Sequence, residues 1–142
     1  MLDARHILIE ADLCRDCQAC TLACSLFHHG ECSLELARLR VNKDLAQHKV
    51  EINLCRQCDY PDCIAACPNA ALRYDEHGRV RLFEEECLQC GACAGACRFH
   101  AIFYNANLGM YLKCDLCAGR PGGPACTELC PVGALTLIME EG

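Results

Sequence analysis

The apolar residues of this 142-residue chain occur in short runs that are separated by turn-forming residues. Alternation of apolar and polar residues over about four to eight positions is typical of half-buried strands. Turn residues at 75–78 and 105–109 predict two hairpins between such runs. None of the runs approaches the roughly 20 residues that a membrane-spanning helix needs. The pattern therefore predicts no membrane span and short strands at 6–12, 71–74, 79–85, 101–104, 110–113 and 134–139.

The composition suggests that side-chain packing alone does not hold this chain together. Seventeen residues are cysteine and none is tryptophan. Leu, Ile, Val and Phe together make up less than a quarter of the chain, which is a thin apolar core for this length. Small proteins with thin cores usually rely on disulfides or bound metal, so the cysteines are the obvious candidates.

Charge and the N-terminal sequence narrow the function classes. The net charge is −6 and no basic stripe is present, which argues against nucleic-acid binding. The N-terminal residues lack the cationic start, apolar run and cleavage site of a signal peptide, and they contain no twin-arginine pair. We therefore expect a cytoplasmic protein, in which thiols stay reduced and disulfides are unusual.

Sixteen of the cysteines fall into four groups of four. Groups one and three have the spacing C-x2-C-x2-C-x3-C, whereas groups two and four lengthen the second gap. All four groups keep three residues before their last cysteine. The groups are Cys14, Cys17, Cys20 and Cys24; Cys55, Cys58, Cys63 and Cys67; Cys87, Cys90, Cys93 and Cys97; and Cys114, Cys117, Cys126 and Cys130.

This spacing favours iron–sulfur clusters over zinc. Structural zinc sites usually take two C-x2-C pairs separated by a longer stretch, so each group would leave one thiol surplus. In the bacterial ferredoxin run, three close cysteines bind one [4Fe–4S] cluster and the fourth binds another. The chain is therefore expected to carry four [4Fe–4S] clusters. The spacing alone does not say which groups pair, because short hairpins link group two to three and group three to four.

The expected fold is α+β, a single compact polyferredoxin domain over 1–142. It would consist of two bacterial-ferredoxin-like two-cluster units with short strands and short helices, built on groups 14–24, 55–67, 87–97 and 114–130. The insert 25–54 holds none of these sixteen cysteines, and its strand-like segments 37–42 and 48–54 predict an inserted β-hairpin. Such a hairpin could form a docking surface or could cover a cluster from water.

The four groups, with CRQCDYPDCIAACP second and KCDLC opening the fourth, resemble the iron–sulfur subunits of the dimethyl sulfoxide reductase type. Similar proteins serve formate dehydrogenases and hydrogenases. The segment CSLFHHGECSLELARLRV most resembles the small partners of tungsten aldehyde oxidoreductases and benzoyl-coenzyme A reductases. Two departures from the common pattern are Cys97-Arg98 and Cys24-Ser25, where other groups place a proline after the last cysteine.

The resemblance implies that group one pairs with four and group two with three. It thereby implies four ligand sets. These are Cys14, Cys17, Cys20 and Cys130; Cys24, Cys114, Cys117 and Cys126; Cys55, Cys58, Cys63 and Cys97; and Cys67, Cys87, Cys90 and Cys93.

The sequence shows no catalytic motif beyond the cysteine groups, so a non-catalytic electron-transfer subunit is expected. Its expected partner is a catalytic subunit with a tungsten or molybdenum pterin, of the aldehyde oxidoreductase type. A hydrogenase or formate dehydrogenase partner, a free polyferredoxin, a stacked assembly and a redox sensor are the alternatives.

Four further residues carry expectations of their own. Cys32 lies outside every group and is predicted to be a small buried apolar residue. Arg98 could bring positive charge to a cluster or point into solvent. His28 and His29 are not needed as iron ligands and are expected at the surface.

Overall fold

The computed structural model describes residues 4–58, 61–76, 78–118, 120–121 and 123–140. Its helices are α1 (Ala19–His29), α2 (Asp62–Ala66), α3 (Ala92–Ala96) and α4 (Ala125–Leu129). Its strands are β1 (Ala4–Ile9), β2 (Leu39–Asp44), β3 (Lys49–Leu54), β4 (Leu72–Tyr74), β5 (Val80–Leu82), β6 (Ile102–Asn105), β7 (Met110–Lys113) and β8 (Leu135–Glu140).

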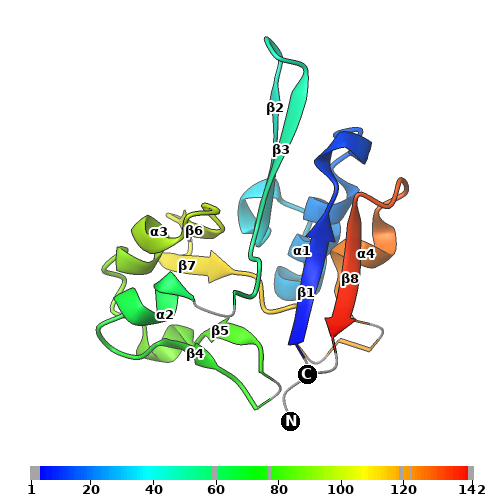
Figure 1. Cartoon of the computed structure of the whole chain (residues 1–142). Helices are drawn as coiled ribbons and strands as arrows, with labels where there is room; N and C mark the ends of the chain where they lie inside the picture. The colour runs from blue at the N-terminus through cyan, green and yellow to red at the C-terminus, as the bar shows by residue number, and fades with distance from the viewer. Residues whose placement is uncertain (1–3, 59–60, 77, 119, 122, 141–142) are drawn as a thin grey trace.

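The described elements form two halves with a hairpin rising from the body (Figure 1). One half, here the terminal half, contains the antiparallel pair β1–β8 and the packed helices α1 and α4. The other, the central half, contains the pairs β4–β5 and β6–β7 and the packed helices α2 and α3. The mixture of short helices and short antiparallel pairs agrees with the expected α+β, ferredoxin-like class.

Each half has a small core built from the inward residues of its strands. Ile7 and Leu135 of β1 and β8 pack with Leu39 and Leu54 at the base of the β2–β3 hairpin. In the central half, the core gathers Leu72, Val80 and Ile102. Cysteine and alanine make up more than half of the buried apolar residues in the described chain. The core is therefore as thin in branched apolar side chains as the composition indicates.

The predicted strands are confirmed with small shifts, except at the ends of 6–12 and 79–85. β1 stops at Ile9, and a 3-10 turn over Ala11–Leu13 follows. β5 stops at Leu82, and a 3-10 turn over Glu84–Glu86 follows. Phe83 N–H still bonds Ala71 O at 2.7 Å, after which the chain turns toward Cys87. The extension of this strand to residue 85 was wrong because three successive glutamates lead into a cysteine loop instead. Residue 77 of the 75–78 turn lies outside the described residues.

The hairpin in the 25–54 insert is confirmed as β2–β3, and it has a covered base and an exposed tip. Ile52 and Leu54 are buried at the base, whereas Leu45 near the tip is 75% exposed. Val41 and Ile52 line a cavity together with Cys130 and the first three cysteines of group one. The base thus covers that part of the molecule from water, and the tip projects away from the body (Figure 1).

Gly91, which precedes α3, is expected to tolerate no side chain. Its φ is +79°, and a Cβ there would lie 2.7 Å from Tyr111 Oη. We expect Gly91→Ala to lower the free energy of unfolding by about 1–2 kcal/mol, because an L-residue in the left-handed region carries that penalty. Gly95→Ala is the matched control, since it lies within α3 and a Cβ there meets nothing within 4 Å. Equal thermal unfolding midpoints for the two variants would contradict this prediction.

Candidate iron–sulfur sites

The four cysteine groups begin with the same backbone conformation. The second residue after the first cysteine has a left-handed φ in every group: 57° at Asp16, 49° at Gln57, 58° at Gln89 and 58° at Leu116. This turn directs that residue's N–H at the sulfur of the first cysteine, at 3.3–3.4 Å. Backbone N–H groups aimed at sulfur stabilise thiolate, which is the form that binds metal.

The last two cysteines of groups two, three and four share a second arrangement. A five-residue helix carries the third cysteine at its second position and places the fourth directly after its end. The N–H four residues beyond the last cysteine then reaches its sulfur, from Ala71 to Cys67, from Ala101 to Cys97 and from Ala134 to Cys130, at 3.3–3.4 Å. Backbone N–H donors hold the pKa values of the Cys67 and Cys130 thiols low, although burial alone would raise them.

Group one differs because its helix continues for more than a turn past Cys24. The N–H of Arg38, from the start of the hairpin insert, therefore donates to Cys24 Sγ at 3.2 Å in place of a nearby loop residue. Ala23 of α1 packs against Ala125 of α4 and against Cys117, which precedes that helix. These small side chains let the two helices approach closely. The insert thus supplies the N–H donor that the three groups with shorter helices obtain from their own loops.

We group the sixteen thiols by the four ligand sets that the resemblance implies. Within each set several thiols lie near enough to raise one another's pKa or to line one cavity, and thiols of neighbouring sets, such as Cys114 and Cys55, also lie close together. We call them set A (Cys14, Cys17, Cys20, Cys130), set B (Cys24, Cys114, Cys117, Cys126), set C (Cys55, Cys58, Cys63, Cys97) and set D (Cys67, Cys87, Cys90, Cys93).

Burial is the main reason that several of these thiols resist ionisation. It raises the pKa of Cys20 to about 11 and that of Cys24 to about 12, and repulsion from neighbouring thiolates adds to both shifts. Cys63 rises to a pKa of about 11 for the same reasons. Any metal bound by these sulfurs must displace their protons, so its binding releases protons and depends on pH.

The four sets follow one another across the molecule. Cys17 of set A and Cys90 of set D are exposed, whereas the described cysteines of set B are all buried. Cys20 lies near Cys126, so set A adjoins set B, and Cys114 lies near Cys55, so set B adjoins set C. Sets C and D meet where α2 packs against α3. The exposed sets are therefore at the two ends of the series.

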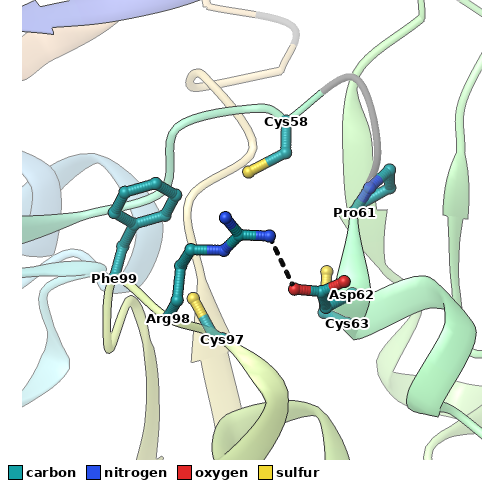
Figure 2. A pocket seen from close by; sticks show the side chains of 7 residues that line it. All are labelled: Cys58, Pro61, Asp62, Cys63, Cys97, Arg98 and Phe99. Carbon is teal, nitrogen blue, oxygen red and sulfur yellow. Dashed lines mark hydrogen bonds and ion pairs between the residues drawn. The ribbon is translucent and has the colours of Figure 1, made fainter.

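A cavity of about 280 Å³ lies at set C and is lined by Cys58, Cys63 and Cys97. Figure 2 shows these side chains from close by. Arg98 extends along the cavity and forms an ion pair with Asp62 at 3.2 Å, although 70% of the arginine side chain is exposed. Arg98 therefore combines the two expectations, because it reaches solvent and also brings positive charge beside set C. Its charge acts to lower the pKa of Cys58, against the larger effect of burial.

Two expectations about single residues were wrong. Cys32 is exposed, because it lies in the part of the insert between the end of α1 at Gly30 and the β2–β3 hairpin. His28 is not a surface residue, since 92% of its side chain is covered and its Nε2 lies 3.0 Å from Asp115 Oδ1. The same ring's Nδ1 lies 2.9 Å from the carbonyl oxygen of Cys24.

Sequence reasoning also missed the buried charges that flank Cys114. Lys113 and Asp115 are both buried. Asp115 contacts His28 and, at 3.6 Å, Arg38. These two partners hold the pKa of Asp115 at about 2 against the opposing effect of burial. The sequence signal for these buried charges was the segment KCDLC, in which Lys113 and Asp115 flank a cysteine in otherwise apolar surroundings.

Two negative observations apply to the described residues. No three His, Cys, Asp or Glu side chains among them are grouped so as to hold a metal ion. Helices long and apolar enough to cross a membrane are absent from the same part of the chain.

Residues 46–140 match the family model described as a 4Fe-4S dicluster domain. The chain belongs to this family. It is 42% identical over 126 residues to the polyferredoxin-like subunit of an aliphatic sulfonate oxidoreductase of Pyrococcus furiosus, covering 87% of this chain and 70% of that protein. It is 34% identical to the putative electron transport protein YsaA of Escherichia coli, covering 96% and 91% of the two chains.

A solved structure extends the similarity over the whole fold. The active site complex BamBC of benzoyl coenzyme A reductase contains a chain that is similar at a TM-score of 0.63 with 26% identity. The match covers 100% of this chain and 79% of that one. Family membership and this likeness agree with the four repeated cysteine loops.

Proposed function

We propose that this chain is the electron-transfer subunit of an oxidoreductase complex and carries four [4Fe–4S] clusters, one on each of sets A, B, C and D. The observation that carries the proposal is the fourfold repetition of one thiolate-stabilising loop. Each first cysteine accepts an N–H bond from a left-handed residue two positions later. A disulfide scaffold has no need of this geometry, whereas a thiolate ligand does.

The pairing of the groups rests on helix packing and on the electrostatic proximity of the thiols. Packing of α1 against α4 supports sharing of cysteines between groups one and four, and packing of α2 against α3 supports sharing between groups two and three. In each pair, the last cysteine of one group lies with the first three of the other. This is the exchange that a two-cluster ferredoxin run uses.

A [4Fe–4S] cluster, when bound, supplies a centre that accepts and releases one electron at a time. The chain's own residues hold the four sites in the order A, B, C, D and bury all four thiols of set B. Exposed cysteines at the outer sets offer places where electrons enter and leave. The protein would thus relay single electrons between a catalytic subunit and a further donor or acceptor.

The proposed partner is a catalytic subunit with a tungsten or molybdenum pterin. Support comes from the sequence resemblance of the segment after group one, and from relatives that are named as parts of a sulfonate oxidoreductase and of a benzoyl coenzyme A reductase complex. Another relative is named the electron transfer subunit of a thiosulfate reductase of Salmonella typhi. All three are named as parts of oxidoreductases, so a docked subunit is favoured over a free polyferredoxin.

The first experiment is a metal count on anaerobically purified protein. We expect about 16 iron per chain, from four cubanes of four iron each. A count of about four zinc with no iron would overturn the proposal. A count of about eight iron would show two clusters per chain in place of four.

The second experiment identifies the partner. Anaerobic purification of the native complex, followed by mass spectrometry of the proteins that co-elute, should recover a pterin oxidoreductase subunit. The isolated chain should show no substrate turnover. Recovery of a hydrogenase or formate dehydrogenase subunit would correct the partner and retain the electron-transfer role. Elution as an isolated monomer would favour a free polyferredoxin.

A further inference from the structure

Lys113 is the most deeply buried lysine or arginine in the described part of the chain, and it lies where the two halves meet. It ends β7, immediately before Cys114, and the residue is only 3% exposed. Its ammonium group donates hydrogen bonds to Val80 O at 2.5 Å and to Cys114 O at 2.9 Å. A buried ammonium is costly unless opposite charge lies nearby, so its surroundings must compensate for it.

The compensating charge comes from sulfur atoms in both halves. Lys113 lies near Cys55, Cys114 and Cys63, and these three residues would be thiolates when they bind clusters. Cys55 and Cys63 belong to set C, and Cys114 belongs to set B. Among the described residues, no carboxylate forms an ion pair with Lys113 at 4.0 Å or less. The cation therefore faces the thiols of the two inner sets.

A neutral side chain already ties the same junction together. Gln57 Nε2 donates to Cys114 O at 3.3 Å and lies 3.6 Å from Cys55 Sγ. Its Oε1 accepts a hydrogen bond from Val80 N–H at 2.7 Å. Gln57 thus contacts the same three residues, Val80, Cys55 and Cys114, that Lys113 contacts. What Lys113 adds to this junction is its positive charge.

We propose that the buried positive charge of Lys113 raises the reduction potentials of both inner clusters, those on sets B and C. This inference rests on the four-cluster assignment proposed above. Reduction of a cluster adds one negative charge, so a fixed cation nearby stabilises the reduced form more than the oxidised form. Since one ammonium faces both inner sets, it acts on the two clusters between which an electron must cross from one half to the other.

The test is a series of variants at Lys113 in the complete, cluster-loaded chain. Lys113→Met removes the charge and the hydrogen bonds, Lys113→Gln keeps a donor without charge, and Lys113→Arg keeps the charge. Redox titrations followed by electron paramagnetic resonance measure the cluster potentials. We expect the Met and Gln variants to lower two of four potentials, each by about tenfold in the reduction equilibrium, or about 59 mV for one electron. Lys113→Arg should stay close to the unmodified protein.

A control variant separates the buried charge from the loss of any cation. Lys43→Met removes an exposed cation from the β2–β3 hairpin, where solvent screens its charge, and should leave the potentials unchanged. If Lys113→Met binds less iron than the unmodified chain, Lys113→Gln is the deciding variant.

The outcomes distinguish this inference from the proposed function. Fewer than four titrating clusters in the unmodified chain would overturn the four-cluster assignment. With four clusters present, an unchanged set of potentials in Lys113→Gln, or an equal shift of all four, would overturn only the role of Lys113. A fall in two potentials for the Met and Gln variants, but not for Lys43→Met, supports the role of Lys113.

Discussion

The chain prepared without iron is expected to be unfolded under conditions in which the iron-loaded protein is folded. The buried apolar residues are mostly cysteine and alanine in the described chain, and these side chains bury little area. Without metal, the buried thiols of Cys20 and Cys24 stay protonated at neutral pH, because burial raises their pKa values to about 11 and about 12, and no metal–sulfur bonds hold the groups together. For sites of this kind, the free energy of metal binding is the free energy of folding.

Far-ultraviolet circular dichroism and one-dimensional NMR under reducing, anaerobic conditions measure this effect. Loss of the helical signal and of resolved upfield methyl resonances is expected after chelation. The iron-loaded protein in the same buffer is the control, and renewed loading with iron and sulfide should restore its spectrum. A metal-free chain that keeps native chemical-shift dispersion would show that side-chain packing suffices for the fold.

Replacing Cys126 by alanine is expected to remove one inner cluster and interrupt electron transfer along the chain. Cys126 is 4% exposed and lies near Cys24 and Cys117 of set B and near Cys20 of set A. Iron should fall from about 16 to about 12 per chain, since a cubane of four iron is lost. Transfer between the outer clusters should then nearly stop, because the electron must cross the space that set B occupies.

Cys32→Ala is the matched control for this variant. Cys32 is exposed and belongs to none of the four sets, so its replacement should change neither the iron content nor electron transfer. Iron analysis and the rate of reduction of an external acceptor by the reconstituted complex measure both variants. An unchanged iron count in Cys126→Ala would show that set B is not a cluster site.

Hydrophobic alternation predicted most of the strands, because each is half-buried in a two-stranded sheet with one face on a small core. Residues 101–104 and 110–113 illustrate this, since Ile102 and Leu112 turn inward from the pair β6–β7. The method failed at residues 83–85, where charge and the approach to Cys87 decide the backbone. Local patterns cannot reveal such a change, because it depends on where the following cysteine loop must lie.

The wrong predictions for His28 and Cys32 have a common cause. His28 and Asp115 are 87 positions apart, and only the packing of α1 beside the loop before α4 brings them together. Cys32 appears buried by residue type, yet its loop lies outside both cores. Burial of one side chain depends on neighbours distant in sequence, so composition and spacing give only the average behaviour of its residue type.

The sequence by itself determined the kind of site in this protein, because ligand chemistry depends on residue type and on short spacing. Four groups with three close cysteines and a fourth one helical turn later specify iron–sulfur loops without reference to the rest of the chain. Tertiary structure decided how these groups come together. The packing of α1 with α4 places group one beside group four, and the packing of α2 with α3 places group two beside group three. The meeting of the two halves buries Lys113 near Cys55 and Cys114. Such contacts join residues far apart in sequence, and only the folded chain fixes them.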